Sequence, residues 1–140
     1  MRILAQICLL CISMLLCGKT AQHNEAQRYR TVITMENGAA ISGISIFVHE
    51  GGEVKGCLFN EFGVTAIEFT YDTTRHKVKL HHVIKMLDKW YIKRVLRKDL
   101  RCVIEGLQRG EMSYHNERRH ISYEFSPINE SDDGATQLFI

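Results

Sequence analysis

The alternation of apolar and polar positions is clearest in residues 88–106, where it predicts one long amphipathic helix. Apolar residues recur there at the three- and four-residue steps of a single helical face. These positions are Ile92, Val95, Leu96, Leu100, Val103, Ile104 and Leu107. Asp88 stands where an N-cap residue would accept from free amides, and Gly106 suits the left-handed C-terminal position. Because a helix of this length is marginal alone in water, its apolar face must pack against another element.

One charged residue, Asp99, interrupts that apolar face. At about 100° per residue it falls between Val95 and Val103. A carboxylate buried there must be paired or hydrogen-bonded, or it binds a proton and stays neutral. We expect a structural Asp99, tied to a loop amide or an arginine. The alternatives are a functional carboxylate in a cavity and a helix tilted enough to expose the residue.

Period-two alternation predicts strands on both sides of the helix. The clearest strand is residues 64–72, in which Ile67, Phe69 and Tyr71 point to one side. The expected strands are residues 29–35, 40–49, 53–59, 64–72, 77–82, 111–114 and 118–125, with residues 137–140 as a last strand or a frayed end. Strands around one long helix are typical of the α+β class. We therefore predict a curved antiparallel β-sheet, a half-barrel-like meander, with the amphipathic helix packed on its concave face.

Two further features concern the faces and turns of this sheet. In residues 40–49, Ile44, Ile46 and Val48 share one face. The run from Asn60 to Gly63 predicts a turn, because Asn and Gly permit unusual backbone angles, and we expect Phe62 within it to pack inward.

The N-terminal residues predict export. Arg2 precedes an almost wholly apolar run to Leu16, which is short for a membrane span and typical of a signal peptide. We divide the 140 residues into a signal peptide (1–16), a lipid-anchored tether (17–28) and one α+β domain (29–140). The residues before Cys17 resemble a bacterial lipoprotein signal, which makes Cys17 the predicted lipidation site. A soluble secreted protein and an uncleaved anchor are the alternatives.

Charge is distributed unevenly along a chain whose net charge is only +2. Lysines and arginines gather on the polar face of the predicted helix. This basic face consists of Lys89, Lys93, Arg94, Arg97, Lys98 and Arg101. A solvated helix face is the simpler interpretation, and a patch for lipid phosphates or an acidic partner protein is the functional one. The export signal argues against nucleic acid as a partner.

Motifs of catalysis and cofactor binding are absent from the sequence: it has no nucleophile elbow, no P-loop and no dinucleotide fingerprint. Cys57 and Cys102 remain after the leader, and we favour two separate thiols over a disulfide. His81 and His82 would face opposite sides of a strand, and His115 and His120 lack a third ligand at a recognisable spacing. The sequence thus predicts a non-enzyme without cofactor or metal.

Several of these stretches together resemble a known class of proteins. They are Ser42-Gly43 at a strand start, Asn60 to Gly63 in a turn, the Phe69 strand, and the helix carrying Lys98-Asp99-Leu100. The chain resembles small bacterial envelope lipoproteins and is more distantly similar to the LolA/LolB class. That resemblance implies an incomplete β-barrel that is covered by helices and holds lipoprotein acyl chains.

These features combine into two functional hypotheses. The first is a non-catalytic lipoprotein of the outer membrane, facing the periplasm, that binds an acyl chain, lipid or lipoprotein in a LolA/LolB-like cavity. The alternative is a structural or assembly partner that docks an acidic envelope protein through the basic face. In both, the membrane is reached through the lipid anchor on Cys17.

Overall fold

The computed structural model describes residues 25–129 and contains seven strands and two helices within that range. The predicted signal peptide, Cys17 and the expected last strand at residues 137–140 lie outside the described residues. In chain order the elements are β1 (Ala26–Thr34), β2 (Ala40–Glu50), β3 (Glu53–Asn60), β4 (Thr65–Asp72), β5 (Lys77–Val83), the 3-10 helix η1 (Lys85–Leu87), α2 (Trp90–Gln108), β6 (Ser113–Asn116) and β7 (Ile121–Pro127).

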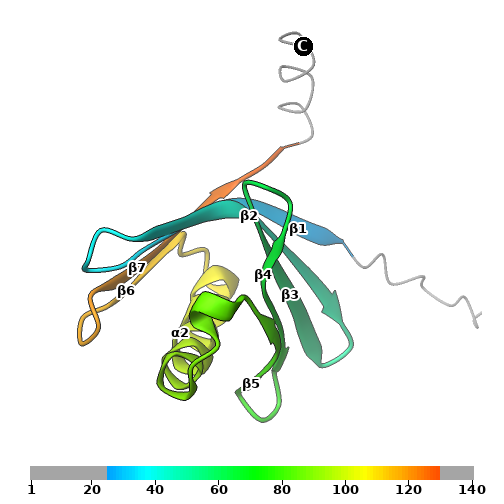
Figure 1. Ribbon diagram of the computed structural model, residues 1–140. Coiled ribbons are helices and arrows are strands. Elements are labelled where there is room, and N and C mark those ends of the chain that lie inside the picture. The colour runs from blue at the N-terminus through cyan, green and yellow to red at the C-terminus, as the bar shows by residue number, and fades with distance from the viewer. Residues whose placement is uncertain (1–24, 130–140) are drawn as a thin grey trace, which may run out of the picture.

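All seven strands form one antiparallel sheet in the order β5-β4-β3-β2-β1-β7-β6. The sheet curls into a half-barrel, and α2 lies in its concavity (Figure 1). The two edge strands, β5 and β6, both contact α2, so the helix bridges the open side of the curl. The predicted fold class is confirmed, including the helix on the concave face.

The predicted apolar face of the helix forms the centre of the core. Leu96, Leu100, Val103 and Ile104 are buried, while Ile92, Val95 and Leu107 are partly buried. The sheet contributes mainly aromatic side chains from its inner face. The largest of these are Tyr29, Phe47, Phe69, Tyr71, Tyr123 and Phe125. Four of the rings pack edge to face or tilted, with centroids 5.7–6.2 Å apart, which fills a curved interior economically.

The start of α2 differs from the prediction. The helix begins at Trp90, and Lys89, not Asp88, is the N-cap residue, with no side-chain capping bond. Asp88 instead accepts a 2.8 Å hydrogen bond from Nζ of Lys93. The short η1 turn uses Asp88 as its own C-cap, so the carboxylate lies outside the first turn of α2 and bonds to Lys93 from there.

The end of α2 also differs from the prediction. The helix continues past Gly106 to Gln108, and the left-handed residue is Gly110, with φ of 84°. The amides of Glu111 and Gly110 bond to the carbonyls of Gly106 and Leu107, which is the Schellman pattern. Gly106 is buried inside the helix, and a Cβ there would lie 2.9 Å from Oε2 of Glu111, the end of a flexible side chain.

Two expectations about the sheet were incomplete or wrong. Ile44, Ile46 and Val48 do share a face, but it is the outer one, because Ile41, Ser45 and Phe47 are the buried residues of β2. The turn after β3 forms as expected, since Oδ1 of Asn60 accepts from the amides of Phe62 and Val64. Phe62 does not pack inward, however: its side chain is 81% exposed at the tip of this turn.

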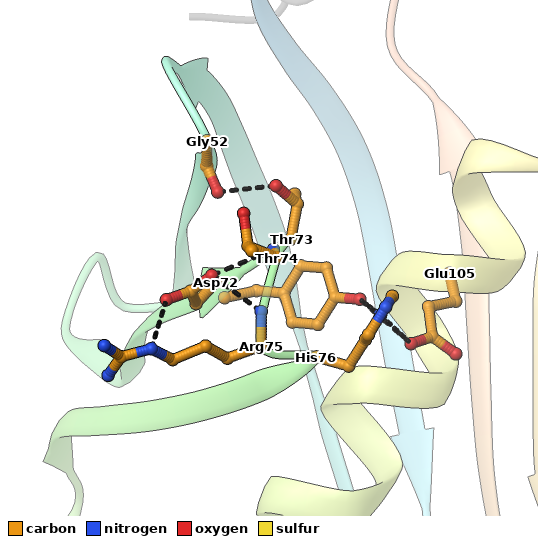
Figure 2. Close-up of polar contacts among 8 residues, drawn as sticks. Gly52, Asp72, Thr73, Thr74, Arg75, His76 and Glu105 are labelled. Atoms are coloured by element: carbon orange, nitrogen blue, oxygen red, sulfur yellow. Dashed lines mark hydrogen bonds and ion pairs between the residues drawn. The ribbon is translucent and has the colours of Figure 1, made fainter.

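Polar contacts fasten the β4–β5 turn to the second half of α2 (Figure 2). The hydroxyl of Tyr71 donates to Oε1 of Glu105 on the helix at 2.9 Å, and Nδ1 of His76 lies 3.1 Å from the same hydroxyl. Burial and the bond to Glu105 raise the pKa of Tyr71 to about 12. Beside it, Oδ1 of Asp72 accepts from the amides of Thr74 and Arg75, which closes the turn. This end of the half-barrel is therefore held shut against the helix.

The close approach of the paired strands β2 and β3 at Gly43 yields a test of the sheet. A Cβ added at Gly43 would fall 1.7 Å from the carbonyl oxygen of Phe59, a backbone atom that cannot rotate away. We expect Gly43→Ala to lower the free energy of unfolding by about 3 kcal/mol in urea denaturation. Ser42→Ala, at the neighbouring exposed position, is the control and should change stability by less than about 0.5 kcal/mol. Equal stabilities would contradict this arrangement of β2 on β3.

Candidate functional site

An apolar groove lies at one end of the half-barrel, opposite the end fastened by Tyr71. The β1–β2 turn, the β6–β7 loop, η1 and the first turns of α2 all meet there, since neighbouring strands run antiparallel. The groove has a volume of about 620 Å³. This falls within the range of about 300–1,000 Å³ that is usual for small-molecule sites.

Apolar side chains from both layers form the walls of this groove. The sheet and its turns contribute Ile33, Met35, Ala39, Ile41, Ile67, Ile121 and the ring of Tyr123. The helical side contributes Met86, Leu87, Tyr91, Ile92, Val95 and Leu96. Of the helical residues, Ile92, Val95 and Leu96 belong to the first half of the predicted apolar face. The sheet buries Leu100, Val103 and Ile104 in the second half of that face, whereas Ile92 and Val95 in the first half are only partly buried and line the groove.

The rim of the groove carries large exposed apolar side chains. Trp90 is 74% exposed, and its ring lies edge-on to Tyr91 with centroids 5.9 Å apart. Met86 is also mainly exposed, and the tip of the β3–β4 turn places Phe62 at the same end of the sheet. Apolar surface therefore extends from the groove onto the outside of the molecule, which is uncommon unless something covers it.

Asp99 lies behind the groove and is 1% exposed. Its two carboxylate oxygens accept hydrogen bonds of 2.7 Å from the hydroxyl of Tyr123 and from Nδ2 of Asn116. The expected structural, buried Asp99 agrees with this geometry, although its partners are a tyrosine on β7 and an asparagine on β6. No buried side-chain polar atom of the described residues lacks a partner.

These bonds attach the β6–β7 hairpin to α2. Burial raises the pKa of Asp99 above its usual value, against the lowering effect of the bonds from Tyr123 and Asn116. Asn116 also accepts from the amides of Arg118 and Arg119 through Oδ1, so the same side chain shapes the loop beside the groove. The carboxylate does not itself line the groove. Its geometry is that of a residue that positions one wall.

The basic face lies on α2 away from the sheet, and its members are exposed except for Lys93, which is partly buried. Lys93 pairs with Asp88 at 2.8 Å and lowers the pKa of that carboxyl. The other five residues make no ion pair with an acid among residues 25–129. The structure thus brings Lys89 to the groove rim and leaves the rest of the basic face as a separate surface.

Cysteines and histidines do not converge on a site in the described chain. Cys57 and Cys102 are free thiols, as favoured from the sequence. Within residues 25–129, no three His, Cys, Asp or Glu side chains are grouped to hold a metal ion. His81 bonds to Thr70 and His115 to Ser122 across neighbouring strands. Among the same residues, no helix has the length and apolar character to cross a membrane.

The groove itself was not located from the sequence. Two of its rim residues, Met86 and Tyr91, flank the predicted helix start, and Met35 ends a predicted strand. None of the three was assigned to a site from the sequence. All three are large apolar residues at or next to the ends of regular elements, and this placement does not by itself distinguish a cavity from a well-filled core.

Comparison with known proteins does not assign the chain to a family. Searches of protein-family models, curated proteins and solved structures gave no significant match. The similarity to the LolA/LolB class stays a prediction from short motifs.

The network around Asp99 yields a stability test. Asp99→Ala leaves the Tyr123 hydroxyl and the Asn116 amide buried without their acceptor, so we expect the free energy of unfolding to fall by about 2–4 kcal/mol. Lys98→Ala, one position away on the exposed face, should cost less than about 0.5 kcal/mol. Urea denaturation measures both; comparable losses would show that the hydrogen bonds are unimportant.

A comparison of the wild type with Asp99→Ala also tests the protonation of Asp99. Because the pKa of Asp99 is raised in the folded state, folding favours the protonated form. The contribution of that form to the free energy of unfolding is complete below the unfolded pKa of about 3.9. That contribution falls as the pH rises through the folded pKa. The stability advantage of the wild type over Asp99→Ala should therefore shrink from pH 4 towards pH 7. An advantage that grows over this range would mean that the hydrogen bonds outweigh burial.

Proposed function

We propose that this protein is a non-catalytic, exported lipoprotein that binds an acyl chain in the groove between α2 and the concave face of the sheet. The single observation that carries the proposal is the groove of about 620 Å³ with apolar walls from both layers. The ligand chemistry follows from those walls. Polar side chains are confined to the rim, so the interior offers few partners to a polar molecule.

The energetics of an acyl chain suit such a site. Each methylene group removed from water contributes about 0.8 kcal/mol, without a need for directional bonds. The flexible side chains of Met35 and Met86 at the entrance can adapt to a chain of variable conformation. The exposed Trp90 and Tyr91 would continue the apolar path from the entrance to a donor of the ligand. The predicted anchor at Cys17 would keep the groove near a membrane.

The absence of catalysis is part of the proposal. Asp99 is the one buried carboxyl among residues 25–129, and both of its oxygens are occupied by Tyr123 and Asn116. We assign it to holding the wall of the groove in place, which a binding protein needs and which explains why a charged residue occurs in the apolar face.

Trp90 is the only tryptophan of the chain, and its ring lies 5.9 Å from the ring of Tyr91, which lines the groove, so its fluorescence should respond to a ligand there. We expect a fatty acid brominated along its chain to quench the fluorescence of Trp90, because bromine quenches at short range. The unlabelled fatty acid should reverse the quenching by competition. Ala39→Phe fills the groove mouth and should weaken binding about tenfold or more, equivalent to two displaced methylenes.

Ala40→Phe is the matched control, since Ala40 is exposed, adjacent and outside the groove. It should bind the fatty acid as the wild type does. The proposal fails if there is no quenching, if the unlabelled acid does not compete, or if both variants bind normally.

A second function is favoured by one observation on the basic face. Arg94, Arg97, Lys98 and Arg101 are exposed and have no acidic partner within the described residues. A concentration of uncompensated positive charge on one side of a helix attracts an acidic surface. We therefore infer that this side could dock an acidic envelope protein while the groove faces elsewhere.

Charge reversal separates the two functions. Replacing Lys93, Arg94, Arg97 and Lys98 by glutamate should abolish cross-linking to an acidic envelope partner, because attraction becomes repulsion. The affinity for an uncharged acyl ligand should be unchanged, since only apolar walls contact it. Cross-linking that survives the reversal would remove the docking function, and a parallel loss of acyl binding would indicate a misfolded variant, which circular dichroism would detect.

A further inference from the structure

The charged residues of the groove rim are two cations and one acid. Lys89 approaches from the start of α2, Arg119 from the β6–β7 loop, and Glu36 from the β1–β2 turn. All three side chains are exposed, and none makes an ion pair with another of the described residues. Apolar walls with an unpaired rim of two cations and one acid, a net charge of +1, are complementary to a molecule that has a long apolar tail and a negative head.

We propose that the groove selects single-chain amphiphiles with an anionic head, such as a carboxylate or a phosphate monoester, and that Lys89 and Arg119 hold this head at the mouth. The inference rests on the proposed acyl-binding function and adds the ligand class and two specificity residues. Arg119 presents a planar fork that suits a carboxylate or phosphate, and Lys89 presents a mobile point charge. Their opposite positions, on the hairpin and on the helix, place the head between the two layers.

The position of Arg119 is itself determined by the network behind the groove. Oδ1 of Asn116 accepts from the backbone amide of Arg119 at 3.1 Å, and Nδ2 of the same side chain donates to Asp99. The following residue, His120, has φ of 51°, a left-handed conformation that closes the loop. The backbone that carries the guanidinium is thus fixed relative to α2 and to Lys89. Because the backbone positions that carry the two cations are fixed, only the side chains need to be ordered when a head group binds.

The test compares three probes of equal chain length that differ only in the head. They are tetradecanoate, 1-tetradecanol and tetradecyltrimethylammonium, each used below its micelle concentration to displace a neutral fluorescent dye from the purified protein. We expect tetradecanoate to bind about tenfold more tightly than the alcohol, and the cation more weakly than both. The preference should decrease with added salt, because the rim is exposed and screened.

Variants of the rim identify the residues responsible. The double variant Lys89→Gln and Arg119→Gln should bind tetradecanoate and the alcohol equally, with the alcohol affinity unchanged. Glu36→Gln should increase the preference for tetradecanoate, since it removes the one negative charge. Arg94→Gln, a cation of the same helix outside the groove, is the control and should keep the wild-type preference.

To identify the source of the head group, tetradecyl phosphate is compared with vesicles of phosphatidylglycerol. Displacement by the free amphiphile but not by vesicles indicates a soluble ligand, and displacement by both indicates uptake from a membrane; each outcome supports an anionic ligand. Equal binding of the acid and the alcohol to the wild type would overturn the head-group inference while leaving acyl binding intact. An unchanged preference in the double variant, or an equal loss in Arg94→Gln, would also overturn it. If no probe displaces the dye, the proposed function itself is wrong.

Discussion

The structure depends on burying one side of a single helix under a sheet that has to bend to reach it. A flat sheet touches a helix along a narrow line, whereas a curled sheet surrounds the apolar face over a wide angle. The antiparallel connections allow this because each strand can be rotated slightly relative to its neighbour. The two edges, β5 and β6, then meet opposite sides of α2, so the helix replaces the strands that would have closed a barrel. The helix can therefore be buried only if the sheet is curved, and the two requirements act as a single constraint.

Asp99 shows how that constraint is adjusted locally. A purely apolar helix face would allow α2 to slide or rotate against the apolar concave face of the sheet, since dispersion contacts depend little on orientation. The bonds from Tyr123 and Asn116 have direction, and they come from two strands at the edge of the sheet. On the other side of the helix, Tyr71 bonds to Glu105. These polar contacts fix the helix in rotation and in register, at the cost of removing one carboxyl from water.

Much of this arrangement could be predicted from the periodicity of the chain. The helix, all seven strands of residues 25–129 and the antiparallel class follow from positions repeated at 3.6 or 2 residues, and Asp99 stood out as the one residue that broke the rule. The helix ends could not be predicted as well. Asp88 and Gly106 were good local signals for the helix ends. Asp88 is instead the C-cap residue of η1, and Gly106 lies within the last turn of α2, which is closed by the amides of Gly110 and Glu111. The neighbouring segments, and not the local preference of these residues, determine where α2 begins and ends.

Periodicity predicted neither the direction of the Phe62 side chain nor the position of the groove. An apolar residue in a turn can pack inward or project into solvent, and only the position of the neighbouring turns decides between the two. The groove arises in the same way. The aromatic side chains of the sheet bury Leu100, Val103 and Ile104. They do not cover Ile92 and Val95 fully, and these two residues stay partly exposed. A chain selected only for stability would fill that end with larger side chains, because unfilled apolar space loses packing energy. The groove is therefore the place where the packing of residues 25–129 is incomplete, and exposed aromatic residues lie beside it.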